Sequence, residues 1–236
     1  MAKQVKLKID GEYVTVEAGR TILDVAREMG KFIPALCHME GLKGVGACRL
    51  CLVEVAGINR LLPACTTPVK DGMSVSTNSD RIAECRRTIL QLLLSERNHT
   101  CAVCVSNGKC ELQALAAELG VTHTPFPYRF PKLPVDATHE RFVIDHNRCV
   151  LCGRCMRVCR DVEGANVWNF VSRGINVMIA AELNDPWGES DTCTNCGKCF
   201  EVCPTGAIAM KGKAIGEPSK SSDRITHLVA ARGEKR

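Results

Sequence analysis

Fifteen of the sixteen cysteines in this 236-residue chain fall into four groups with short internal spacings. The groups are Cys37, Cys48, Cys51 and Cys65; Cys101, Cys104 and Cys110; Cys149, Cys152, Cys155 and Cys159; and Cys193, Cys196, Cys199 and Cys203. Grouped thiolates bind soft metals, as zinc or as iron–sulfur clusters. Zinc sites usually combine two separated Cys or His pairs, so two runs of four cysteines, each within eleven residues, favour iron–sulfur clusters over a zinc scaffold.

The third and fourth groups share the spacing C-x2-C-x2-C-x3-C and lie 44 residues apart. In such a run three thiolates hold one [4Fe–4S] cluster, and the fourth cysteine ligates the cluster of the other run. We therefore expect two clusters that exchange a ligand. Their predicted ligands are Cys149, Cys152, Cys155 and Cys203 for one, and Cys193, Cys196, Cys199 and Cys159 for the other.

The first group has the wider spacing C-x10-C-x2-C-x13-C. Four widely separated thiolates suit the flatter [2Fe–2S] unit. Gly41, Gly44 and Gly46 in the long interval permit the tight loop that such a cluster needs. We predict a [2Fe–2S] cluster here.

The second group has the spacing C-x2-C-x5-C and is one thiolate short of four. His99, two residues before Cys101, is a candidate fourth ligand, because an imidazole can replace a thiolate. Cys85 is a rival, although it lies on the apolar stripe of a predicted helix, where a free cysteine behaves as a small hydrophobe. An unidentified ligand, or no fourth ligand at all, is the remaining alternative. We predict a third [4Fe–4S] cluster with His99 as ligand.

The elements around these groups indicate a mixed α+β chain. Apolar residues alternate with lysines through residues 5–9, an Asp-Gly pair supplies a hairpin turn, and Thr21 with Asp24 forms a capping-box pattern before a helix. Further strands are expected at 50–55 and 73–77. A helix is predicted over 80–95 with an apolar stripe of Ile82, Cys85, Ile89, Leu92 and Leu93, and another after the second group with Leu112, Leu115, Ala116 and Leu119 inward. A hairpin is expected within 167–181.

Four units follow from these patterns. They are a [2Fe–2S] domain over 1–80, a helical [4Fe–4S] domain with a proline-rich linker over 81–138, a two-cluster domain over 139–212, and a basic tail over 213–236.

The charge distribution bears on partners and location. The chain has a formal net charge of +5, and residues 211–236 carry seven Lys or Arg but no aromatic residue, so nucleic-acid binding is not expected. The N-terminus has no apolar secretory segment, and no stretch approaches the roughly 18 apolar residues of a membrane span, so we expect a cytoplasmic protein. Five cations lie beside candidate ligands, as solvated residues or as charges that balance the clusters: Arg49, Arg148, Arg154, Arg157 and Lys198.

The order of the four groups resembles the small iron–sulfur subunit in the diaphorase module of NAD-reducing nickel–iron hydrogenases. It is also similar to the N-terminal part of the large iron–sulfur subunit of complex I and of iron-only hydrogenases. The motifs that carry the resemblance are the first cysteine group, Cys101 to Cys110 with Glu111-Leu112-Gln113 after it, and the doubled run ending Cys203-Pro204-Thr205-Gly206-Ala207-Ile208. One position departs: Arg97 stands where complex I and iron-only hydrogenases carry the ligand His, and His99 follows two residues later.

The resemblance implies a β-grasp [2Fe–2S] ferredoxin domain, a small helical domain with a His-ligated [4Fe–4S] cluster, and a bacterial-ferredoxin-like domain with two [4Fe–4S] clusters. It implies an electron-transfer subunit of a hydrogen:NAD oxidoreductase, with one [2Fe–2S] and three [4Fe–4S] clusters. The implied partners are an FMN- and NAD-binding diaphorase subunit and the small and large nickel–iron hydrogenase subunits.

The sequence assigns no catalytic residue to this chain. It has no G-x-G-x-x-G motif at a strand-to-helix turn, no Walker loop, and no Ser/His/Asp or paired-carboxylate constellation. Because the chain ends at Arg236, we expect a separate subunit with its substrate sites on partner chains. The alternatives are the equivalent subunit of an NAD-linked formate dehydrogenase and a free-standing ferredoxin-like carrier.

Overall fold

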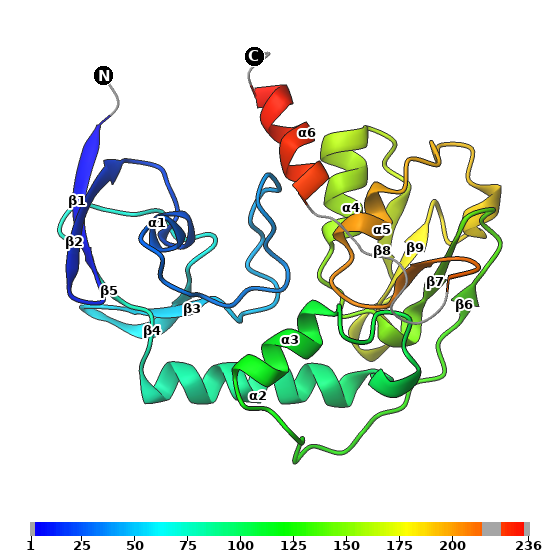
Figure 1. The fold of residues 1–236 in the computed structure, drawn as a ribbon, viewed down its shortest axis with the longest axis horizontal. Helices are drawn as coiled ribbons and strands as arrows, with labels where there is room; N and C mark the ends of the chain where they lie inside the picture. Colours follow the sequence, from blue (N-terminus) through cyan, green and yellow to red (C-terminus); the bar gives the residue numbers. More distant parts are fainter. Residues whose placement is uncertain (1–2, 214–222, 234–236) are drawn as a thin grey trace.

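The computed structural model describes residues 3–213 and 223–233, and arranges them as three small sheets with helices between and beside them (Figure 1). The helices are α1 (Ile22–Glu28), α2 (Asp80–Glu96), α3 (Glu111–Glu118), α4 (Arg154–Arg157), α5 (Lys198–Val202) and α6 (Asp223–Gly233). The strands are β1 (Gln4–Ile9), β2 (Glu12–Glu17), β3 (Leu52–Val55), β4 (Ile58–Pro63), β5 (Ser74–Ser76), β6 (Val135–Asp136), β7 (Phe142–Asp145), β8 (Trp168–Val171), β9 (Met178–Ala181) and β10 (Ile208–Met210). The predicted α+β class is confirmed.

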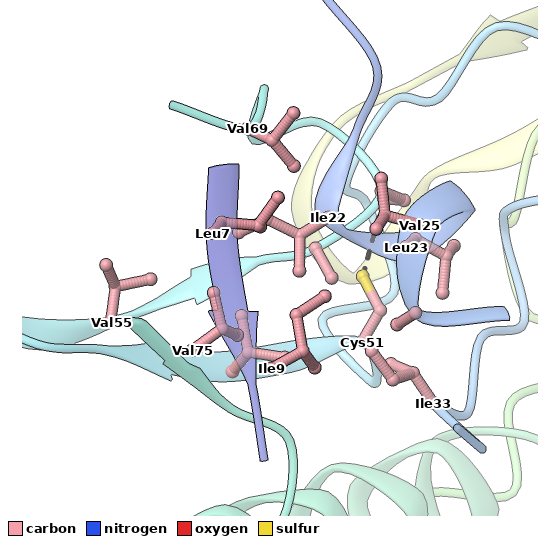
Figure 2. Packing of buried hydrophobic residues seen from close by; sticks show 14 of the residues in the cluster. Leu7, Ile9, Ile22, Leu23, Val25, Ile33, Cys51, Val55, Val69 and Val75 are labelled. Carbon is pink, nitrogen blue, oxygen red and sulfur yellow. Dashed lines mark hydrogen bonds between the residues drawn. The ribbon is translucent and has the colours of Figure 1, made fainter. Parts of the chain in front are cut away.

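The N-terminal domain is a five-stranded sheet in the order β2-β1-β5-β3-β4, with β1 and β5 parallel and the other pairs antiparallel. Helix α1 packs its apolar face on this sheet, and Figure 2 shows Ile22, Leu23 and Val25 against Leu7 and Ile9. The capping box is present: the Thr21 side chain accepts from the Asp24 N–H, and the Asp24 carboxylate accepts from the Thr21 N–H. This is the predicted β-grasp arrangement. Strand β4 was not predicted.

Helix α2 runs below both halves of the molecule in Figure 1 and joins them. Its bounds agree with the prediction. The predicted set of inward-facing apolar residues is partly wrong, since Leu92 is 47% exposed whereas Leu90 is fully buried. The face of α2 toward the first cysteine loop carries Arg86, whose Nε and Nη2 donate to the backbone carbonyls of Leu50 and Leu52 at 3.1 and 2.9 Å. The pattern of apolar residues does not predict a buried arginine in the middle of that face.

A second apolar cluster lies where α2, α3 and the first cysteine loop meet. Its buried members are Leu36, Leu50, Leu90, Leu112 and Val121. Leu115, Ala116 and Leu119 of α3 pack against them, as predicted. This cluster places the start of α3, directly after Cys110, beside the loop that carries Cys48.

The C-terminal half contains the sheet β10-β7-β6 and the hairpin β8-β9. The hairpin confirms the strand pair expected within 167–181. Aromatic rings fill the space between these sheets: Trp187 lies 5.8 Å from Phe142 and 4.7 Å from Trp168, between ring centroids. The predicted linker 121–138 contains one short regular element, the two-residue strand β6, and is otherwise irregular.

Helix α6 lies beside α4 and α5 (Figure 1). Its Ile225 is fully buried in a cluster with Met39 and Leu42 from the first cysteine loop and with Val158 and Val202 from the C-terminal half. Of the predicted basic tail over 213–236, residues 214–222 and 234–236 lie outside the described residues.

We expect the substitution Arg86→Met to lower the free energy of unfolding by about 2 kcal/mol, because the carbonyls of Leu50 and Leu52 would lose their donors in a buried site. Urea unfolding of the chain, followed by far-ultraviolet circular dichroism, measures the effect. Arg87→Met is the matched control, since Arg87 is the exposed next residue of the same helix. Equal losses in the two variants would contradict the assigned role of the two hydrogen bonds.

Candidate metal centres

The four thiols of the first group meet at one place, in loops that border α1, β3 and β4. The sulfur atoms of Cys51 and Cys65 are 3.4 Å apart, and the Cys51 thiol is seen within the apolar cluster in Figure 2. The backbone N–H of Cys48 donates to the Cys37 sulfur at 3.4 Å. The Cys37 thiol also contacts the thiols of Cys48 and Cys65. The structure therefore brings together all four predicted ligands of the [2Fe–2S] cluster.

The chain around these thiols is closely packed. A Cβ atom added to Gly44 would lie 2.3 Å from the backbone oxygen of Cys65, so this position accepts only glycine. Thiol contacts set the protonation of the group: they lower the pKa of Cys37, chiefly through Cys48, and the Cys65 thiol lowers the pKa of Cys51 to about 7. Contacts with Cys37 raise the pKa of Cys48 and Cys65 in turn. Such a set of neighbouring thiols fits a site for an iron–sulfur cluster, because the ligands of a cluster are thiolates.

The second group lines a cavity that also borders Arg148 and Gly206. His99, Cys101, Cys104 and Cys110 are all in its wall, whereas Cys85 is not among the described residues that line it. A Cβ atom added to Gly206 would lie 2.5 Å from the Cys104 sulfur. Hence the wall around the second group is completed by a residue from the loop after Cys203, in the C-terminal half.

His99 lines this cavity and carries a ring nitrogen without a hydrogen-bond partner. Its ring hydrogen-bonds to the backbone carbonyl of Leu93, while its Nε2 is buried without a hydrogen-bond partner. The Leu93 bond therefore belongs to Nδ1 and leaves Nε2 as a free acceptor. Burial lowers the pKa of His99 to about 4, with Arg148 and Arg97 acting in the same direction, so the ring is neutral at pH 7.

Arg97, which stands at the position of the ligand His in complex I and iron-only hydrogenases, points elsewhere. Its side chain is buried, and its Nη2 donates to the backbone carbonyl of Val177 at 2.9 Å, in the connection between β8 and β9. His99 thus lines the cavity, whereas Arg97 binds the β8–β9 hairpin through the Val177 carbonyl.

The third and fourth groups line two further cavities. The walls of the first contain Cys149, Cys152, Cys155 and Cys203. The walls of the second contain Cys193, Cys196, Cys199 and Cys159. Each cavity therefore has three cysteines from one run and the fourth from the other, which is the predicted exchange. In the described ranges, no group of three or more His, Cys, Asp or Glu side chains has the arrangement that would hold a single metal ion, and this includes the first cysteine group.

The sequence repeat is also a repeat of backbone conformation. Leu151 and Gly153 have φ values of 53° and 66°, and the corresponding Asn195 and Gly197 have 57° and 73°. These left-handed residues turn the chain around each cavity and lead into α4 and α5, which carry Cys155 and Cys199. The short helices then direct Cys159 and Cys203 away from their own runs.

Burial raises the free energy needed to ionise these thiols when no positive charge is near. It raises the pKa of Cys149 to about 12 and of Cys152 to about 11, and it raises the pKa of Cys155 and Cys199 as well. Arg154 and Arg157 act in the opposite direction on the pKa of Cys152. Iron supplies the positive charge that such a site needs, so the donor sets fit iron–sulfur clusters.

Of the five cations beside candidate ligands, Arg154 and Arg157 are buried, at 3% and 4% exposure. Arg154 binds the Glu111 carboxylate through both terminal nitrogens and donates to the His38 carbonyl. Arg148 pairs with Asp145, Lys198 pairs with Glu163, and Arg49 is exposed. The solvated alternative is thus wrong for the two arginines of α4.

His139 is a further site residue that the sequence analysis missed. Its Nδ1 accepts the backbone N–H groups of Arg141 and Phe142, so its Nε2 carries the proton that faces the Cys193 sulfur at 3.8 Å. The cysteine spacing contains no signal for it, because it comes from a strand connection 54 residues earlier.

Comparison with family models divides the chain as the geometry does. Residues 2–80 match a 2Fe-2S iron-sulfur cluster binding domain, residues 86–125 match the NADH-ubiquinone oxidoreductase-G iron-sulfur binding region, and residues 141–209 match the ferredoxin-like domain of NADH-quinone oxidoreductase subunit 3. These matches confirm one [2Fe–2S]-binding domain and further iron–sulfur regions. Every helix in the described ranges is too short or too polar to span a bilayer.

Several similar curated proteins are much longer than this chain. The chain is 38% identical to NADP-reducing hydrogenase subunit HndD of Solidesulfovibrio fructosivorans, over 86% of this chain and 35% of HndD. It is 36% identical to the alpha subunit of the NADPH-Fe(3+) oxidoreductase of Geobacter sulfurreducens, over 88% of this chain and 24% of that protein. It therefore spans about a third or a quarter of these relatives.

Two matches extend over nearly whole chains. The chain is 34% identical to the gamma subunit of the NAD-reducing hydrogenase HoxS of Cupriavidus necator, over 91% of this chain and 90% of that protein. A chain in the crystal structure of an NAD+-reducing [NiFe]-hydrogenase in the H2-reduced state superposes with a TM-score of 0.85 at 33% identity, over 91% and 90% of the two chains. The chain therefore belongs to the iron–sulfur protein family that includes the HoxS gamma subunit.

Proposed function

We propose that this chain relays single electrons between a nickel–iron hydrogenase module and an FMN- and NAD-binding partner subunit. The observation that carries the proposal is the set of four separate thiol-lined sites in a chain that matches nearly the whole HoxS gamma subunit. That full-length match favours the hydrogenase over the formate dehydrogenase alternative. The proposal assigns the conversion of hydrogen and of NAD to partner chains and keeps the complex in the cytoplasm.

The proposed cofactors are one [2Fe–2S] cluster and three [4Fe–4S] clusters. The first group would hold the [2Fe–2S] cluster, and His99 with Cys101, Cys104 and Cys110 would hold one [4Fe–4S] cluster. The exchanged sets would hold the remaining two, as the two cavities of the C-terminal half suggest. When bound, such a cluster accepts and releases one electron at a time.

The protein's own contribution is to place and shield these sites. Thiol and imidazole groups bind, glycines such as Gly44 and Gly206 let backbone and sulfur approach closely, and apolar residues exclude water. Water-poor surroundings and N–H groups that face sulfur, such as those of Cys48 and His139, are the means by which a protein sets a cluster's potential.

Chemical analysis of the anaerobically purified chain tests the cluster assignment. We expect about 14 iron atoms and about 14 acid-labile sulfides per chain, which is the content of one [2Fe–2S] and three [4Fe–4S] clusters. A content of about 10 iron atoms would remove one [4Fe–4S] cluster from the proposal. Zinc in place of iron and sulfide would overturn it.

The exchange of ligands is tested by comparing serine variants. We expect Cys203→Ser to change the same electron paramagnetic resonance signal as Cys152→Ser, because both thiols line one cavity. Cys159→Ser should change the signal that Cys199→Ser changes. If Cys203→Ser instead changes the signal altered by Cys199→Ser, the runs hold independent clusters.

The contact between Gly206 and Cys104 is tested by Gly206→Ala. The added methyl group would overlap the Cys104 sulfur, so we expect the variant to lose the His99-containing cluster and about 4 iron atoms per chain. Iron analysis measures the loss, and the unchanged [2Fe–2S] signal serves as an internal control. Full iron content in Gly206→Ala would show that the loop has room for the methyl group.

A further inference from the structure

Arg157 links the first and third cysteine groups through backbone carbonyls. It lies on α4, between Cys155 and Cys159, and only 4% of it is exposed. Its Nη2 donates to the carbonyl oxygen of Cys37 at 2.5 Å and to that of Cys152 at 3.2 Å. One nitrogen atom therefore touches the main chain of a predicted [2Fe–2S] ligand and of a predicted [4Fe–4S] ligand.

The other nitrogens of this guanidinium have the same kind of partner. Nη1 donates to the carbonyl of Lys43 at 2.9 Å, in the loop between Cys37 and Cys48, and Nε donates to the carbonyl of Gly153 at 3.2 Å. The hydrogen bonds of Arg157 are thus divided between the loop that surrounds the first group and the loop that surrounds the third.

These partners satisfy the hydrogen-bond donors of Arg157 but not its charge. In the part of the chain that the structure describes, no carboxylate forms an ion pair with Arg157, whereas its neighbour Arg154 binds Glu111. The charge of Arg157 contributes to a lowered pKa of Asp161, one helical turn later. Both carboxylate oxygens of Asp161, however, accept hydrogen bonds from Arg160. A buried cation without an anionic partner is costly, so a compensating negative charge is expected close by.

The two adjoining cysteine groups would supply that charge. Four thiolates around an iron–sulfur core leave a site with a net negative charge, and reduction adds one more. The thiols of these groups favour the charged form of Arg157. Burial lowers the pKa of Arg157, whereas negative charge on Cys152 and Cys37 raises it. Because an arginine side chain keeps its proton, the positive charge is permanent.

We propose that Arg157 is a positioning residue that supplies one positive charge shared by the [2Fe–2S] site of the first group and the [4Fe–4S] site of Cys149, Cys152, Cys155 and Cys203. Its charge favours the reduced state of both sites and raises both reduction potentials. The inference rests on the proposed function, since it needs clusters at both sites.

The test is a redox titration of the purified complex, with Arg157→Gln and Arg157→Lys compared with the native chain. The [2Fe–2S] signal is followed by electron paramagnetic resonance at a temperature at which relaxation has removed the [4Fe–4S] signals, and the latter are followed at lower temperature. Arg87→Gln is the control, because it removes one exposed positive charge from α2. Iron content is measured for every variant.

In Arg157→Gln we expect both reduction potentials to fall. The expected change is roughly tenfold in each equilibrium constant for reduction, which corresponds to about 59 mV for one electron. The cluster of Cys159, Cys193, Cys196 and Cys199 should not shift. Arg157→Lys, which keeps the charge, should stay near the native values, and Arg87→Gln should not differ from them.

Unchanged potentials in an Arg157→Gln complex with full iron content would overturn the inference, as would a shift at only one of the two sites. If Arg157→Gln loses iron, the lysine variant decides. Full iron and native potentials in Arg157→Lys support the role of the charge, whereas loss of a cluster there makes Arg157 a structural residue and overturns the inference. A native complex without the expected iron contradicts the proposed function itself, and the inference with it.

Discussion

Burial of the cysteine thiols is the constraint on which the rest of the structure depends. Cys149, Cys152 and Cys155 lie where burial raises the pKa of a thiol, so they ionise readily only when a positive charge is near. Iron would supply most of that charge, and the fold adds Arg154 and Arg157 beside the same loop. The apolar surroundings that make the thiolates costly also keep water away from the sites, which is what an electron relay needs.

Contacts beside the cysteine groups join the three parts of the chain. Arg154 ties Glu111, directly after Cys110, to the carbonyl of His38, directly after Cys37. Helix α2 binds the first cysteine loop through Arg86, and Gly206 approaches Cys104 from the C-terminal half. Side chains beside one site therefore also contact the loop of a neighbouring site, which holds the sites in a fixed arrangement. A path for electrons requires that fixed arrangement.

Local sequence predicted the features whose causes are local. The spacing of each run places three thiols on one loop and the fourth beyond it, so the grouping of Cys203 with the third run and of Cys159 with the fourth could be predicted, and the cavities contain those residues. The capping box at Thr21 is equally local. Burial of Arg86, Arg154 and Arg157 could not be predicted, because each of them also binds groups far away in sequence: the carbonyls of Leu50 and Leu52 for Arg86, the Glu111 carboxylate and the His38 carbonyl for Arg154, and the carbonyls of Cys37 and Lys43 for Arg157. The contact of His139 with Cys193 depends likewise on strand pairing that the cysteine spacing does not encode.

The central claim is that this chain conducts electrons between a hydrogen-converting and an NAD-converting partner. The most direct measurement is electron paramagnetic resonance of the anaerobic native complex, first after hydrogen is added without NAD, and then after NAD is added. The account predicts that hydrogen reduces the [2Fe–2S] and [4Fe–4S] clusters of this chain and that NAD reoxidises them. Clusters that stay oxidised under hydrogen, or that stay reduced after NAD is added, would contradict it.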